Sequence, residues 1–200
     1  MNGCRCCDCR RFERRDVMIG GAAFAAATMT GVLADDADAA QRPPERQFVQ
    51  AGDRFQAVTG AINKQLVRPE MLELGARPVE AFPLDPASGV LRRRNRLNRL
   101  LLLRLDTAAM SKKTRERSVE GVLAYSALCT HRACTIKSWI PDKQFLRCHC
   151  HLSQFAALET GRIKRGPARR GLPMVPLNLD ADGFVVATDG FTGRPGPAKK

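Results

Sequence analysis

The residues best suited to bind a metal lie in two short segments of this 200-residue chain. The first segment reads Cys-Thr-His-Arg-Ala-Cys and runs from position 129 to 134. The second reads Cys-His-Cys-His-Leu-Ser and runs from position 148 to 153. Together they contain all three histidines of the sequence and four of its eight cysteines. Thiolates and imidazoles ligate zinc and iron–sulfur clusters, so we expect a metal centre here.

Strand-like runs precede both segments and are expected to position them. One apolar run extends from Gly121 to Cys129, and a shorter one from Phe145 to Cys150. Two loops at the tips of such strands can hold a metal between them, each offering a thiolate and an imidazole. This ligand set could bind zinc tetrahedrally, or a [2Fe–2S] cluster with one iron on cysteines and the other on histidines. The residue types alone leave both possibilities open.

The two segments together resemble the metal-binding motifs of the Rieske iron–sulfur family. The pattern C-T-H-x-x-C followed by C-x-C-H-x-S matches that family at its six cysteine and histidine positions. The resemblance extends more loosely from about Phe48 to Gly193. It includes Gly166-Pro167-Ala168, which looks like the start of the proline loop that covers the cluster in this family.

The resemblance implies a role for each residue of the site. The implied ligands are Cys129 and Cys148 for one iron of a [2Fe–2S] cluster, and His131 and His151 for the other. The implied disulfide joins Cys134 to Cys150, which suits an exported protein. Ser153 stands where the family places a hydroxyl that binds a bridging sulfide, and Phe155 where high-potential members carry tyrosine. With one of these two redox-tuning donors present, we expect an intermediate potential.

The sequence departs from the family pattern at four positions. Ala133 and Leu152 each stand where glycine is usual, so we expect the two loops to be slightly reshaped. His149 stands where proline is usual. Its position next to Cys148 makes it a weaker ligand candidate than His151. Arg169 replaces the second proline of the covering loop, which predicts a more electropositive surface there.

The remaining elements predict an all-β fold. We expect a small antiparallel Rieske-type β-sandwich with a cluster-binding subdomain of two metal loops. Pro78 to Leu84 is extended, and the leucine-rich run from Leu97 to Leu105 indicates a buried strand or a short core helix. Asn178 to Ala187 predicts a hairpin that turns at Asp182-Gly183. Only Phe55 to Leu66 favours an amphipathic helix.

The N-terminal 39 residues are typical of an export signal rather than of the fold. Arg10-Arg11 and Arg14-Arg15 precede an apolar run from Val17 to Ala34, and small residues follow at Ala37-Asp38-Ala39. Paired arginines indicate the twin-arginine route, which exports folded, cofactor-loaded proteins. We expect cleavage after the last of these alanines, with retention as an inner-membrane anchor the alternative. Residues 40–47 then form a linker, 48–193 the Rieske domain and 194–200 a flexible basic tail.

The chain carries a formal net charge of +13, which suits an anionic partner. The basic stretches 92–96 and 111–117 have no aromatic residues among their charges, so we interpret them as solvated surface rather than nucleic-acid sites.

Four further cysteines precede the apolar run of the leader. We interpret them as a thiol-rich, disposable segment, because nothing downstream completes a site with them; they are Cys4, Cys6, Cys7 and Cys9.

These features predict a one-electron carrier, the electron-transfer subunit of a respiratory oxidoreductase rather than a complete enzyme. The resemblance implies either a quinol–cytochrome c reductase or an arsenite-oxidase-like molybdenum enzyme. The expected partners are a catalytic or cytochrome subunit, a soluble or membrane electron acceptor, and quinol. The expected location is the periplasm, with anchoring to the inner membrane if the leader is retained. We expect no binding of nucleic acid. A structural zinc module with a basic nucleic-acid-binding surface is the alternative, which export and the two spare cysteines disfavour.

Overall fold

The computed structural model describes residues 42–198. The predicted leader, its four cysteines and the start of the predicted linker lie outside these residues. Within them, no helix is long and apolar enough to cross a membrane.

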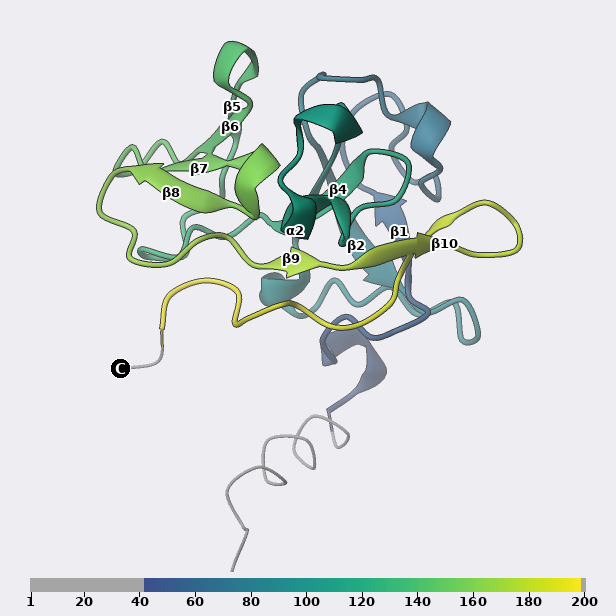
Figure 1. Cartoon of the computed structure of the whole chain (residues 1–200). Coiled ribbons are helices and arrows are strands. Elements are labelled where there is room, and N and C mark those ends of the chain that lie inside the picture. The colour runs from purple at the N-terminus through teal and green to yellow at the C-terminus, as the bar shows by residue number, and fades with distance from the viewer. Residues whose placement is uncertain (1–41, 199–200) are drawn as a thin grey trace, which may run out of the picture.

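Eleven antiparallel strands in two sheets make up the described fold (Figure 1). The large sheet has the strand order β10-β11-β1-β2-β3-β4-β9, and the small sheet has the order β5-β6-β7-β8. The strands are β1 (Arg54–Ala57), β2 (Val79–Leu84), β3 (Leu100–Arg104), β4 (Val122–Ser126), β5 (Ser138–Ile140), β6 (Phe145–Arg147), β7 (Gln154–Ala156), β8 (Arg162–Arg165), β9 (Met174–Val175), β10 (Leu177–Leu179) and β11 (Val185–Ala187). The helical elements are the short α2 (Lys112–Arg115) and six 3₁₀ turns: η1 (Pro44–Arg46), η2 (Pro69–Met71), η3 (Arg96–Asn98), η4 (Thr107–Ala109), η5 (Pro141–Lys143) and η6 (Ala157–Glu159). The predicted all-β antiparallel fold is therefore confirmed.

The large sheet is curled nearly into a barrel. Its two edge strands, β9 and β10, are separated in the chain only by Pro176. Consecutive residues can belong to opposite edges only if the sheet bends until those edges meet. The backbone N–H of Thr188, just after β11, donates to the Pro176 carbonyl at 2.9 Å and ties this closure point to the barrel.

Two central strands of the barrel are buried on both faces. In β3, Leu100 and Leu102 point into the barrel core, while Leu101 and Leu103 belong to a second core between the sheets. Strand β4 divides its side chains in the same way, which explains why both strands are continuous apolar runs. Most of the Leu97 to Leu105 run, from Leu100 to Arg104, is thus a buried strand, one of its two predicted forms.

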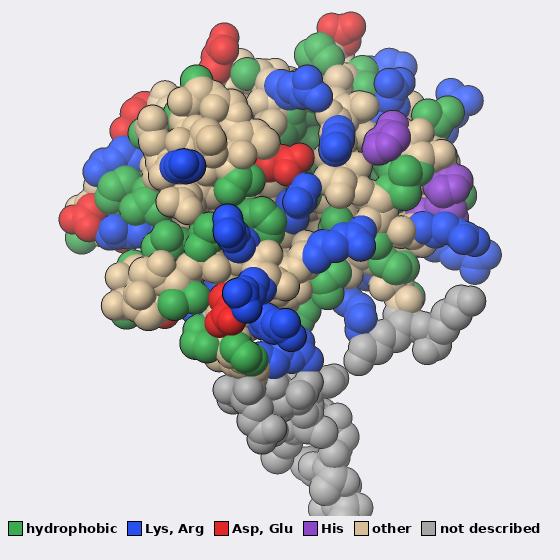
Figure 2. Space-filling model, turned by 180° about the vertical axis from the view of Figure 1, so that it is seen from behind, with side chains coloured by type: hydrophobic (Ala, Val, Ile, Leu, Met, Phe, Trp, Pro, Cys, Tyr) green, Lys and Arg blue, Asp and Glu red, His purple; other side chains and the backbone are tan. Residues whose placement is uncertain are grey.

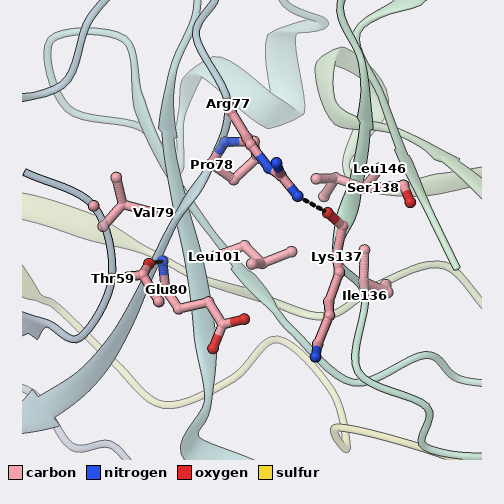
Figure 3. A pocket seen from close by; sticks show the side chains of 11 residues that line it. Thr59, Arg77, Pro78, Val79, Glu80, Leu101, Ile136, Lys137, Ser138 and Leu146 are labelled. Carbon is pink, nitrogen blue, oxygen red and sulfur yellow. Dashed lines mark hydrogen bonds between the residues drawn. The ribbon is translucent and has the colours of Figure 1, made fainter.

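The small sheet packs against the outer face of β3 and β4 and carries the second core (Figure 1). At the junction, the Arg77 guanidinium donates to the Lys137 carbonyl at 2.7 Å, and the Trp139 indole donates to the Gly75 carbonyl at 3.2 Å. A cavity of about 450 Å³ lies beside the first of these bonds (Figure 3). Its apolar floor includes Leu101, which belongs to the second core.

Two local predictions are wrong. Phe55 to Leu66 is not a helix. Its first residues belong to β1, in which the alternate side chains of Phe55 and Ala57 are buried, and Gly60 then turns the chain with a left-handed φ of 76°. Arg92, expected in a solvated basic stretch, is only 3% exposed. Its guanidinium binds the buried Asp53 carboxylate through both oxygens, at 2.9 and 3.2 Å.

The same arginine fixes the N-terminal segment to the barrel. Its guanidinium also donates to the Pro44 carbonyl and to the side-chain oxygens of Gln47 and Gln50. Asn98 adds a second anchor, because its side chain accepts the Val49 N–H and donates to the Gln47 carbonyl. Both contacts hold the start of the described chain on the fold.

Candidate metal centre

Two loops face each other at one end of the small sheet. The first follows β4 and leads to β5, and the second joins β6 to β7. A disulfide between Cys134 and Cys150 links them, as predicted. The sulfur of Cys148 lies within 4.8 Å of both disulfide sulfurs. The disulfide therefore holds the second loop against the first loop, with the free thiol of Cys148 beside the two disulfide sulfurs.

Cys129 and Cys148 are the free cysteines among the described residues, and both are buried. Burial raises the pKa of the Cys129 thiol, and the neighbouring Cys148 adds to this effect, although backbone N–H groups of His131 and Arg132 lower it. A buried thiol with a raised pKa becomes a thiolate most readily when a metal cation replaces its proton. The buried Cys129 thiol, with the buried Cys148 thiol beside it, is therefore suited to bind a metal cation.

His131 and His151 come together across the two loops. Their ring centroids lie 4.6 Å apart, with the rings nearly perpendicular. Burial lowers the pKa of His131, and the positive charges of His151 and Arg132 lower it further. Its Nδ1 atom is buried and has no hydrogen-bond partner. A neutral imidazole with an unpartnered buried nitrogen is well suited to ligate a metal.

His149 does not join this pair. Its side chain is exposed, and its Nε2 atom lies 3.8 Å from the disulfide sulfur of Cys150. The geometry thus pairs His151, rather than His149, with His131.

The two positions where glycine is usual in the family keep a glycine-like backbone. Ala133 has a φ of 55° and Leu152 a φ of 58°, both in the left-handed region. A residue with a Cβ atom is strained there by about 1–2 kcal/mol. Both residues therefore keep the left-handed backbone of a glycine at the cost of strain, so the expected reshaping is not seen at these two dihedral angles.

A third loop, which includes the predicted Gly166-Pro167-Ala168, packs against the second. The Ala168 N–H donates to the Ser153 hydroxyl at 3.2 Å, and a Cβ atom on Gly166 would collide with the Ser153 backbone. Since Ser153 accepts this bond, its own hydroxyl proton is available for another acceptor. The Ser153 carbonyl accepts the Cys148 N–H at 2.9 Å, which fixes the two residues relative to each other.

Aromatic side chains seal the inner side of the site. Phe155 is fully buried on β7, in the same core as both free cysteines. Tyr125 on β4 is also fully buried, and its hydroxyl donates to the Ala157 carbonyl at 2.6 Å. Burial raises the pKa of Tyr125 far above its usual range, so this donor stays protonated. Tyr125 lies within an apolar run of the sequence, and such a run does not reveal a buried hydrogen-bond donor.

Residues 194–198, from the segment predicted as a basic tail, pack beside the site. Pro195 and Gly196 are buried, and the Arg170 guanidinium donates to the Arg194 and Gly196 carbonyls at 3.3 and 2.7 Å. The Thr130 hydroxyl in turn donates to the Arg170 carbonyl at 2.6 Å. The first loop, the third loop and residues 194–198 are therefore held together.

These features define an all-β protein with a cysteine–histidine metal centre between two disulfide-linked loops. The Rieske [2Fe-2S] domain matches residues 103–176, which include both loops. The chain belongs to the Rieske [2Fe–2S] family. Its cofactor is a [2Fe–2S] cluster, and the buried thiols and the unpartnered imidazole nitrogen fit that group.

Known relatives are subunits of respiratory complexes. The chain is 32% identical over 164 residues to the cytochrome bc1 complex Rieske iron-sulfur subunit of Corynebacterium glutamicum, covering 71% of this chain and 40% of that protein. It is 32% identical over 98 residues to a putative respiratory nitrate reductase subunit Rieske of Haloferax mediterranei, covering 49% and 44%. The chain thus spans less than half the length of these relatives. The soluble domain of Rieske protein II from Sulfolobus acidocaldarius superposes with a TM-score of 0.36 and 20% identity, over 45% of this chain and 61% of that one.

Proposed function

We propose that the chain is the electron-transfer subunit of a respiratory oxidoreductase of the quinol–cytochrome c reductase type. A [2Fe–2S] cluster bound here would accept and release one electron at a time. The observation that carries the proposal is the convergence of two buried free thiols with an imidazole whose buried nitrogen has no partner. The relatives named as bc1 complex subunits support this kind of complex over an arsenite-oxidase-like one.

We assign four residues as the cluster ligands. Cys129 and Cys148 would hold one iron and His131 and His151 the other. The disulfide positions the second loop, and the tie between Thr130 and the third loop positions the first. In this proposal, the disulfide and the Thr130 hydroxyl bond hold the two loops in place, so that the four donors would be oriented for the cluster.

Two further residues tune the site in this proposal. Ser153 has a hydroxyl proton available for a sulfur of the cluster, because its oxygen already accepts the Ala168 N–H. Phe155 excludes water from the inner side and offers no donor. One donor instead of two favours an intermediate potential, since hydrogen bonds to cluster sulfurs stabilise the reduced, more negative state.

The proposed location is the periplasm, at the inner membrane. A disulfide between the two loops is stable in an oxidising compartment, and the N-terminal sequence is typical of twin-arginine export. The proposed partners are a cytochrome or catalytic subunit, a soluble or membrane electron acceptor, and quinol. Nucleic acid has no part in this function.

Substitution of each histidine tests the ligand assignment. We expect His131→Cys or His151→Cys to abolish the Rieske electron paramagnetic resonance signal of the reduced protein, and His149→Ala to leave it recognisable. A signal that survives His151→Cys but disappears in the His149 variant would overturn the assignment. A colourless purified protein containing zinc would instead support the structural zinc module, the alternative to a redox centre.

A further inference from the structure

A concave basic surface lies beside the exposed edge of the metal centre. It is a hollow of about 890 Å³ between the first loop, the third loop and the C-terminal segment. His131, Arg132, Arg169 and Arg170 line it, and none of its lining residues is acidic. Figure 2 shows the histidines at one edge of the molecule with Lys and Arg side chains next to them.

The three arginines of this hollow differ in their roles. Arg170 is structural, because its guanidinium binds the carbonyls of the C-terminal segment. Arg132 and Arg169 are exposed, and neither guanidinium has a hydrogen-bond or ion-pair partner among residues 42–198. Arg54 is paired with Asp180 and Asp182, whereas the exposed Arg46, Arg93 and Arg165 have no partner among the described residues either, so what distinguishes Arg132 and Arg169 is their place beside His131 in a hollow without acidic residues. The two unpaired guanidinium groups are therefore available to an outside anion.

The shape and composition of the hollow indicate which anion it binds. A planar guanidinium presents a fork of donors that matches a carboxylate. The site is concave, so it suits a protruding acidic loop better than a flat membrane surface. Leu152, next to His151 in the second loop, is 56% exposed and offers an apolar contact. An apolar contact beside unpaired charges is typical of a protein–protein interface.

We propose that this hollow docks an acidic partner protein, whose carboxylates Arg132 and Arg169 bind beside His131. This inference rests on the proposed function, because it identifies the partner surface of the same metal centre. Opposite charges on the two surfaces would raise the association rate and orient the partner's acidic loop toward the histidine edge. The substitution of arginine for the usual proline at position 169 then contributes to partner choice.

The test removes the two unpaired charges and compares the result with a matched pair elsewhere. The test variant is Arg132→Gln with Arg169→Gln in the full chain. The control is Lys112→Gln with Lys113→Gln on α2, where both side chains are exposed and do not line the hollow. An acidic blue-copper protein serves as the probe and a basic cytochrome c as the counter-probe, and association is followed by stopped flow and calorimetry.

We expect the arginine variant to associate with the acidic probe about tenfold more slowly at low ionic strength, and the control to change far less. Added salt should remove most of the difference, and binding of the basic counter-probe should not weaken. Equal losses in both variants would show an effect of net charge alone, and no loss in the arginine variant would show that the hollow is not used. Either result overturns the proposal.

Two further measurements separate protein docking from lipid binding and from failure of the redox centre. If the arginine pair is required for binding to phosphatidylglycerol vesicles but not to the acidic probe, the surface binds lipid and the proposal is wrong. Visible absorption and midpoint potential are recorded on the same samples. A colourless chain would refute the proposed redox function, while calorimetry with the acidic probe still tests the docking surface, because binding does not require the cluster.

Discussion

Replacing Ala133 with glycine should stabilise the protein, although glycine usually destabilises. The Ala133 backbone has a φ of 55°, where a Cβ atom costs about 1–2 kcal/mol. Glycine removes this strain but loses about 0.5–1 kcal/mol more backbone entropy on folding. The net gain is on the order of 0.5–1 kcal/mol. In a domain of this size, 1 kcal/mol shifts the melting temperature by about 2–4 °C, so we expect a rise of about 1–4 °C.

The matched control is Ala109→Gly, the same chemical change at an exposed residue of η4 whose φ is not in the left-handed region. It should lower the melting temperature, because only the entropy term remains. Leu152 gives a second comparison, in which Leu152→Gly should melt above Leu152→Ala. Both melts are followed by far-ultraviolet circular dichroism and cluster absorption at one scan rate. If Ala133→Gly destabilises as much as Ala109→Gly, the left-handed backbone of the first loop is incorrect.

Three other predictions concern tuning, the disulfide and the buried ion pair. Phe155→Tyr should raise the midpoint potential by some tens of millivolts and Ser153→Ala should lower it similarly, since a tenfold change in a one-electron equilibrium is about 59 mV; film voltammetry at fixed pH measures both, and an unmoved or lowered midpoint in the tyrosine variant refutes the assignment. Intact mass after alkylation without reduction should show no label on Cys134 or Cys150, which close a loop that stabilises by about 3 kcal/mol; label on both would exclude the disulfide. Arg92→Ala should destabilise by about 3–5 kcal/mol in guanidinium denaturation, because a buried carboxylate loses its cation; a change below about 1 kcal/mol, as for an exposed pair, would show that the pair is not buried in solution.

The metal-binding loops were predictable because their chemistry is local. The spacing of cysteine and histidine within each segment is visible in the sequence, and the strand-like runs before them became β4 and β6. The disulfide between Cys134 and Cys150 followed from the family resemblance and is present in the structure. The hairpin turning at Asp182-Gly183 also formed as predicted, between β10 and β11.

The features that the sequence did not predict depend on contacts between distant segments. Arg92 lies in a run of basic residues, and only the fold brings Asp53 to its guanidinium. Residues 194–198 have the composition of a polar tail, and only the fold brings Arg170 to their carbonyls. The alternation of Phe55 and Ala57 is too short to distinguish a strand from a helix, and pairing with β2 decides between them.

Counting the histidine ligands of the bound cluster tests the central claim most directly. The protein would be produced in cells supplied with ¹⁵N-labelled histidine and then reduced. Pulsed electron paramagnetic resonance would measure the coupling of the cluster's unpaired electron to the labelled nitrogens. The proposed ligand set predicts couplings from two histidine nitrogens, both retained in His149→Ala and reduced to at most one in His131→Cys and in His151→Cys. A cluster without histidine coupling, or a coupling lost only in His149→Ala, would contradict it.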